Sequence, residues 1–110
     1  MKPANPNIDL DPRDMAEVIR ILQQQVPELE VWAFGSRVKN TAKPYSNLDL
    51  ALITTQPLSL ERAGALKEAF DESNLPMRVD VVDWAATSES FLRIIAQDKV
   101  VVQLAKGAGV

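Results

Sequence analysis

Two apolar runs separated by a polar loop constrain this chain more than any other feature of its sequence. The first run, residues 31–34, ends abruptly at Gly35-Ser36, and the second begins directly after Asn47. Both runs are short, free of proline and bounded by turn-forming residues, which is typical of strands. We therefore predict strands at residues 29–34 and 48–54.

The residues at the ends of these two strands indicate a nucleotide-handling site. Gly35 and Ser36 follow the first strand, where glycine lets backbone N–H groups approach a phosphate closely and the serine adds a hydroxyl. Asn47 and Asp49 carry side-chain oxygens at the start of the second strand, and such oxygens can hold a divalent cation beside that phosphate. A phosphate cradle next to metal ligands is the outline of such a site.

The remaining elements are predicted from caps and hydrophobic periodicity. Helices are expected after Asp11, Ser59 and Ser88, because each can cap a first turn and precedes apolar residues at helical spacing. A third strand is expected at residues 78–83, and residues 100–102 are either a fourth strand or an apolar tail on the core. Because these elements alternate on a short period, the predicted fold class is α/β (α+β), with a short mixed sheet and helices mainly on one face.

The length of 110 residues predicts one compact domain. We assign this domain to residues 11–104, with a flexible arm at residues 1–10 and a frayed end at residues 105–110. Prolines interrupt the arm, and glycine and alanine dominate the end.

Composition excludes several classes of chemistry. The chain has no cysteine and no histidine, which removes disulfides, thiolate or His-ligated metal sites and an imidazole base. The net charge of −3 argues against direct nucleic-acid binding. No apolar segment is long enough to cross a membrane, and no signal peptide is evident at the start, so we expect a cytoplasmic protein.

Alternation along the strands places two carboxylates on one face of the sheet. The leucines within residues 48–52 share the face that helices must cover, so Asp49 lies on the opposite face. Pairing of the second and third strands can bring Asp80 beside Asp49. Two such carboxylates repel each other unless a cation such as Mg²⁺ lies between them. The alternative is a solvated Asp49, with Asp80 paired to Arg78 or Arg37.

The spaced motif of this chain resembles that of the minimal nucleotidyltransferases of the polymerase-β-like superfamily. The motif consists of Gly35-Ser36, the step Asn47-Leu48-Asp49, and Asp80 on a later strand. Within that group, residues 31–37 (Val-Trp-Ala-Phe-Gly-Ser-Arg) and 77–84 (Met-Arg-Val-Asp-Val-Val-Asp-Trp) look like those of MntA-type antitoxins from MntA–HepT pairs. The resemblance covers nearly the whole chain and implies the polymerase-β-like nucleotidyltransferase fold.

The resemblance also implies how a nucleotide is bound. Gly35 and Ser36 hold the β- and γ-phosphates of ATP, and Arg37 together with Lys39 neutralises phosphate charge. Relatives often have glycine where this chain has Asn40, and asparagine is the next most tolerant residue for a left-handed backbone.

By the same resemblance, Asn47, Asp49 and Asp80 are the catalytic residues and the metal ligands, and Asp80 helps to deprotonate the acceptor hydroxyl. Two Mg²⁺ ions in an active member align attack on the α-phosphorus, with release of pyrophosphate. The family has an aspartate at the position of Asn47. Compared with aspartate, the asparagine keeps one oxygen ligand but loses the negative charge. Three explanations are open: a naturally inactive member, an introduced Asp→Asn change, or a site that works with weaker metal binding.

The implied activity is transfer of AMP from ATP to a hydroxyl, expected to be a tyrosine, of a four-helix HepT-like HEPN toxin. The chain then acts as the antitoxin of that toxin in a hetero-oligomer. Ala51, Ile53, Val82 and Trp84 share the face of the proposed site and are expected to be uncovered, which favours a partner there. The competing interpretation is that the C-terminal segment folds over this face.

The alternative function is a binding module, an antitoxin that neutralises its partner by contact only, and Asn47 favours it. A small-molecule transferase of the antibiotic-modifying kind is weaker, because no second domain for the acceptor is evident. A purely structural domain leaves the strand carboxylates unexplained.

Overall fold

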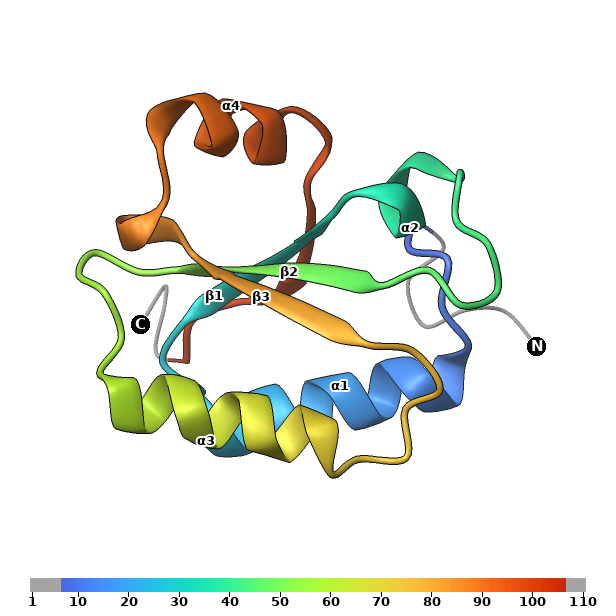
Figure 1. Cartoon of the computed structure of the whole chain (residues 1–110), viewed down its shortest axis with the longest axis horizontal. Helices are drawn as coiled ribbons and strands as arrows, with labels where there is room; N and C mark the ends of the chain where they lie inside the picture. The colour runs from blue at the N-terminus through green and yellow to red at the C-terminus, as the bar shows by residue number, and fades with distance from the viewer. Residues whose placement is uncertain (1–6, 107–110) are drawn as a thin grey trace.

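The computed structural model describes residues 7–106, in which a four-stranded sheet separates two layers of helices (Figure 1). The helices α1 and α3 lie on one face and α4 lies on the other, so the predicted mixed sheet with helices mainly on one face is confirmed. The strand order is β3-β2-β1-β4, with β2 and β3 parallel and the other two pairs antiparallel. The elements in chain order are α1 (Pro12–Gln25), β1 (Glu30–Phe34), α2 (Ser36–Lys39), β2 (Leu48–Ile53), α3 (Leu60–Asp71), β3 (Val79–Asp83), the 3₁₀ helix η1 (Trp84–Ala86), α4 (Glu89–Asp98) and β4 (Val100–Gln103).

The three long helices begin where their caps predict. The side chains of Asp11, Ser59 and Ser88 each accept a hydrogen bond from a backbone N–H in the first turn. Such a bond satisfies one of the N–H groups that a helix leaves without an internal partner. Residues 100–102 belong to β4, which pairs with β1, and this settles the choice between a strand and an apolar tail.

The larger core lies between the sheet and the helices α1 and α3. Leu48, Leu50 and Leu52 are buried in it, as the alternation along β2 predicts. The helices contribute buried side chains such as Leu22 from α1 and Leu66 from α3. This core fixes which face of β2 is apolar and therefore turns Asp49 to the other face.

A second apolar cluster fills the space between the sheet and α4, so the expectation of an uncovered apolar face is wrong. Ala51 and Ile95 are fully buried there, and Ile53, Val82 and Trp84 pack against them. The competing interpretation, in which the C-terminal segment folds over this face, is confirmed. The chain must cross this face to carry β4 from the end of β3 to the free edge of β1, and α4 is that crossing segment.

The ends of the described chain are attached to the domain. Ile8 and Leu10 are buried, and the Asp9 N–H donates to the Arg37 carbonyl at 2.7 Å. The predicted flexible arm is therefore wrong for residues 8–10, because two alternate apolar side chains anchor it in the core. The Lys106 N–H donates to the Pro27 carbonyl at 2.9 Å, so this part of the predicted frayed end is bound.

Residues 1–6 and 107–110 of the predicted arm and end lie outside the described residues. Among the helices within residues 7–106, none is long and apolar enough to cross a membrane.

Candidate active site

Most of the predicted site residues gather at one end of the sheet, where β1 ends and β2 and β3 begin. Asp49 lies opposite Phe34 in the antiparallel pair and opposite Asp80 in the parallel pair. The structure thus brings Asp49 and Asp80 into direct register on adjacent strands, as strand alternation predicts. Gly35 follows Phe34, so the order across the sheet is Gly35, Asp49, Asp80.

Gly35 turns the chain from β1 into α2 with a backbone that favours glycine. Its φ is 80° and its ψ is −155°, in a region that side-chain-bearing residues rarely adopt. A Cβ atom at this position would overlap Asp49 Oδ2 and lie 3.3 Å from Asp49 Cγ. The backbone at Gly35 therefore lies so close to the Asp49 carboxylate that only a residue without a side chain fits there.

The helix α2 is a feature that sequence reasoning missed, since the segment after Gly35 was expected to be a polar loop. The Gly35 carbonyl accepts from the N–H groups of Val38 and Lys39, both at 3.1 Å, and this closes one turn. Asn40 ends the turn with φ 60° and ψ 32°, which confirms the expected left-handed backbone. A single turn leaves too short a hydrophobic pattern to be recognised.

We expect the substitution Gly35→Ala to destabilise the chain by about 2–4 kcal/mol and to abolish any nucleotide transfer, because alanine adds both a strained backbone and an overlap with Asp49. Gly64→Ala is the matched control, since nothing lies within 4 Å of a Cβ there and the residue sits in α3. That control is expected to stabilise the chain by about 0.5–1 kcal/mol. Urea unfolding of both variants tests this, and equal effects would contradict the strained role of Gly35.

Arg37, the first predicted phosphate-binding cation, is buried and bound to backbone carbonyls of the chain itself. The residue is only 6% exposed, and its guanidinium donates to the carbonyls of Asp9 at 2.7 Å, Pro44 at 3.3 Å and Ser46 at 2.9 and 3.0 Å. These bonds fasten the N-terminal segment and the loop before β2 to α2. The arrangement favours a structural role for Arg37.

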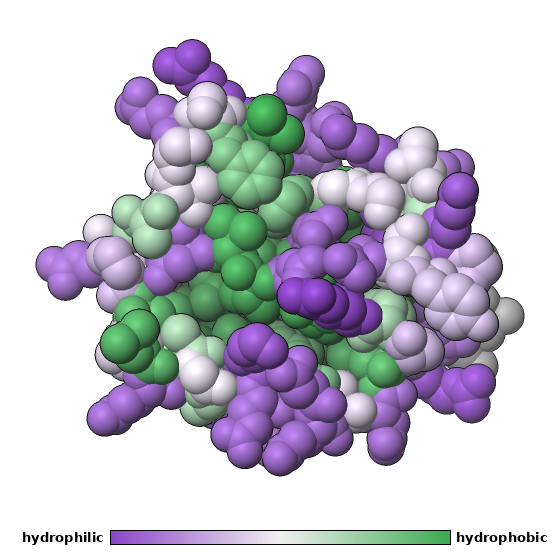
Figure 2. All heavy atoms as spheres, in the orientation of Figure 1, coloured by the Kyte–Doolittle hydropathy of each residue, from purple (hydrophilic) through white to green (hydrophobic). Residues whose placement is uncertain are grey.

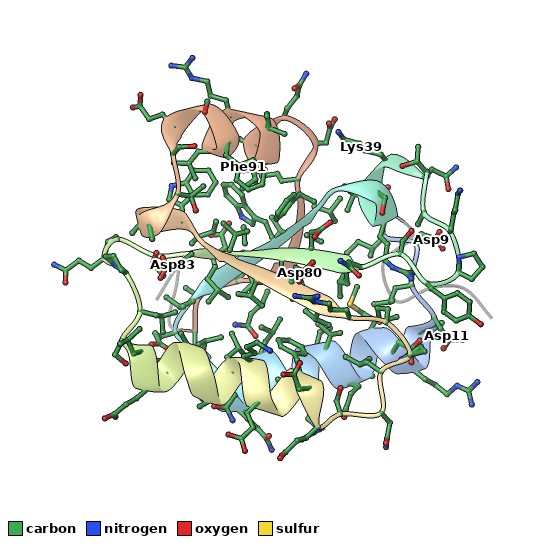
Figure 3. All side chains as sticks on the ribbon, in the orientation of Figure 1. Asp9, Asp11, Lys39, Asp80, Asp83 and Phe91 are labelled. Carbon is green, nitrogen blue, oxygen red and sulfur yellow. The ribbon has the colours of Figure 1, made fainter. Side chains whose placement is uncertain are left out.

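Lys39, the second predicted phosphate-binding cation, is half exposed at the end of α2 (Figure 3). Its Nζ lies 3.6 Å from Asp98 Oδ2 on α4. An exposed ion pair of this length is weak, so the ammonium group can leave Asp98 for a phosphate.

Sequence reasoning also passed over Ser46, which holds the loop before β2. Its carbonyl accepts from Arg37, and its hydroxyl accepts from the Lys43 N–H at 2.8 Å. The Ser46 N–H donates back to the Lys43 carbonyl at 3.0 Å, which closes a turn. The turn-forming run Lys-Pro-Tyr-Ser is the sequence signal for this arrangement.

Asn47 and Arg78 both contact Asp80. The Asn47 amide donates from Nδ2 to Asp80 Oδ2 at 2.7 Å, and Arg78 Nε lies 3.0 Å from Asp80 Oδ1. Both oxygens of this carboxylate therefore have partners in the chain itself, one through a hydrogen bond and the other through an ion pair. The ion pair between Arg78 and Asp80, weighed above as an alternative to metal binding, is present in the same site as the aligned carboxylates.

The Asp49 carboxyl has a raised pKa. The first cause is desolvation, because the group is partly buried against the sheet, and the second is the negative charge of Asp80 beside it. A cation placed between the two carboxylates would oppose both effects by attracting the negative charge, and so would lower this pKa. The site is therefore electrostatically unfavourable as it stands and favours a positive ligand.

We expect Asp49→Asn to raise the stability of the chain at neutral pH and to change it little in acid. A raised pKa in the folded state means that folding favours the protonated carboxyl. This contribution is complete below the pKa of the unfolded chain and is lost as the pH rises through the folded pKa. Urea unfolding at pH 4 and pH 7 measures the difference, and an equal change at both values would contradict the raised pKa.

A metal site built from three acidic side chains is absent from residues 7–106. The site offers the carboxylates of Asp49 and Asp80 and the amide oxygen of Asn47, which are the oxygen ligands that Mg²⁺ prefers. This donor set carries two negative charges, one fewer than a set of three carboxylates would carry. It fits one magnesium ion in ligand type, with a weaker attraction than an aspartate at position 47 would give.

Comparison with known proteins identifies the class that this fold and site define. Residues 16–106 match the family described as Polymerase beta, Nucleotidyltransferase, and the chain belongs to that family. A relative from Haemophilus influenzae, named Probable protein adenylyltransferase MntA, is 55% identical over 96 residues, which cover 87% of this chain and 84% of that protein. Within the family, the chain is thus an MntA-type nucleotidyltransferase.

Solved structures share this fold. A chain from a crystal structure of a toxin-antitoxin with AMP-PNP superposes with a TM-score of 0.69 at 21% identity, over 84% of this chain and 75% of that chain. A chain from a complex of tri-AMPylated Shewanella oneidensis HEPN toxin with MNT antitoxin superposes with a TM-score of 0.57 at 21% identity, over 86% and 73%. At these identities the likeness concerns the fold.

Proposed function

We propose that this chain is a protein adenylyltransferase that moves AMP from ATP to a hydroxyl of a cytoplasmic HEPN toxin and so acts as its antitoxin. The observation that carries the proposal is the register of Asp49 and Asp80 beside the close turn at Gly35. The name of the Haemophilus influenzae relative supports AMP transfer to a protein. The toxin-antitoxin complexes among the similar structures support a HEPN partner, and one of them contains AMP-PNP.

In this proposal the residues of the site divide the chemistry among them. The backbone at Gly35 and the hydroxyl of Ser36 bind the terminal phosphates of ATP. The acceptor hydroxyl, a tyrosine in this proposal, attacks the α-phosphorus, and the bond from that phosphorus to the pyrophosphate oxygen breaks. The hydroxyl proton passes to Asp80 and then to water. Asp49, Asp80 and the Asn47 amide oxygen would hold Mg²⁺, which would neutralise phosphate charge when bound.

One observation favours a second candidate, an antitoxin that acts by contact only. Asn47 and Arg78 already satisfy both oxygens of Asp80 without any metal. A nucleotidyltransferase domain in that state retains its shape and its surface, and it can bind a partner without performing transfer.

The deciding experiment is a transfer assay with α-labelled ATP, Mg²⁺ and the chain's own HEPN partner. Label on the partner is expected with this chain, and none is expected with the variant Asp49→Asn, which keeps the shape of the side chain and removes its charge. Pyrophosphate release should parallel the label. If this chain and its Asp49→Asn variant both bind and silence the partner, and neither transfers label to it, the proposal is overturned in favour of neutralisation by contact alone.

A further inference from the structure

A groove of about 350 Å³ runs along the outer side of β3, between that strand and α3. Its apolar lining comes mainly from Leu58, Leu66, Val79 and Val81, and charged residues that include Lys67, Arg78 and Asp80 also line it. Figure 2 shows hydrophobic atoms gathered between α3 and the strands, with hydrophilic atoms around them. One of the two site carboxylates thus also borders an apolar groove outside the site.

The strand beside this groove is an open edge of the sheet. Within residues 7–106, β3 pairs with β2 alone, so its other side offers backbone groups to an added strand. Val81, at the middle of β3, is 36% exposed, and Leu60, at the start of α3, is 92% exposed. An open edge beside an apolar groove is the arrangement that binds extended peptides by strand addition.

The position of the groove relative to the proposed phosphate site indicates that it lies on the side from which the acceptor approaches. The order across the sheet is Gly35, Asp49, Asp80 and then the free edge of β3, and the groove lies beside that edge on the side of α3. Displacement at phosphorus requires the attacking oxygen to approach from the side opposite the leaving group. With the terminal phosphates at Gly35, as the proposed function has them, pyrophosphate leaves on that side, and the acceptor oxygen arrives from the side of β3.

We propose that the acceptor segment of the partner protein binds as an extended strand along the free edge of β3. An apolar side chain of that segment occupies the groove, and the hydroxyl of the acceptor residue in the same segment lies beside Asp80. This inference rests on the proposed function, and it adds the conformation and the docking site of the substrate. The acceptor is therefore a flexible or extended segment rather than a residue in the middle of a rigid helix.

A second copy of this chain fits the edge less well than an acceptor segment. The sequence of β3, Val-Asp-Val-Val-Asp, contains no hydroxyl that the site could modify. Pairing of two β3 edges also brings Asp80 and Asp83 of both copies to one seam, where like charges repel.

The first test is hydrogen exchange of the backbone amides with and without the HEPN partner. Strand addition is expected to slow exchange along β3 by at least about ten-fold and to leave the other edge strand, β4, unchanged. Unchanged exchange along β3 in the complex would overturn the inference. Slow, concentration-dependent exchange along β3 in the free chain would also overturn it, because the edge would then hold a second copy.

The second test uses a matched pair of edge-strand variants. Val81→Lys places a charge in the groove, whereas Val101→Lys places the same charge on β4, where the valine is 39% exposed. We expect Val81→Lys to raise the KM for the partner by about ten-fold or more, and Val101→Lys to leave it within about two-fold. Equal effects of the two variants would overturn the inference.

These tests separate the inference from the proposed function. Binding of AMP-PNP by the Val81→Lys variant, measured by calorimetry, should match that of the unmodified chain and shows that its site is intact. Absence of label with slowed exchange along β3 would refute AMP transfer but retain the docking edge. Label on the partner with unchanged exchange along β3 would refute the docking edge alone.

Discussion

The substitution Asn47→Asp is expected to increase the rate of AMP transfer by about 10- to 100-fold in the presence of Mg²⁺. The change adds a third negative charge to the oxygen ligands already supplied by Asp49 and Asp80, and ligand charge sets the affinity for a divalent cation. It also removes the Nδ2 donor that binds Asp80 Oδ2 at 2.7 Å, so this oxygen becomes free for the metal. Initial rates with α-labelled ATP and the HEPN partner measure the increase.

The same variant has a second readout that needs neither ATP nor a partner. Without metal, three neighbouring carboxylates repel one another, so the melting temperature in EDTA should fall below that of the unmodified chain. Mg²⁺ should restore it, because an ion that binds only the folded state stabilises that state. Gln56→Glu adds the same charge near the opposite end of β2 and is the control. Equal responses of the two variants to Mg²⁺ would contradict a metal site at position 47.

Strand alternation explains how much of the site could be predicted. One apolar face of β2, marked by Leu48 and Leu50, fixes the direction of Asp49, because a shift of one residue would bury the carboxylate. The same reasoning for β3 puts Asp80 on the same face, and the parallel register aligns the two. Caps and helix periods are equally local signals, and they gave the starts of the three long helices.

The rest of the site depends on contacts that local patterns do not contain. Arg37 follows the Gly-Ser turn and suggests a phosphate contact, yet its partners are carbonyls at Asp9, Pro44 and Ser46. Alternation along the strands marks a second apolar face of the sheet, but only the path of the chain decides that α4 covers it. Attachment of residues 8–10 to the domain depends on hydrogen bonds between Asp9 and Arg37, which are far apart in the sequence.

The substitution Arg37→Met is expected to destabilise the chain by about 3 kcal/mol. Methionine fills most of the same volume but leaves three carbonyl oxygens without the guanidinium that binds them, and unpaired buried polar groups are costly. Arg37→Lys should lose nearly as much, because one ammonium group cannot reproduce a planar fork of donors. Urea unfolding measures both, and Arg20→Met, which removes an exposed pair with Glu17, should cost less than about 1 kcal/mol.

Arg37→Met also decides between the two roles of this residue. If Arg37 holds the loop before β2, the variant should lose protection from hydrogen exchange around Ser46 even in the absence of nucleotide. If Arg37 instead binds phosphate, the variant should keep its stability and lose affinity for AMP-PNP alone. The first result would mean that the basic residue of the Gly-Ser-Arg turn acts through the backbone that carries Asn47 and Asp49. Phosphate charge would then be left to Lys39 and bound metal.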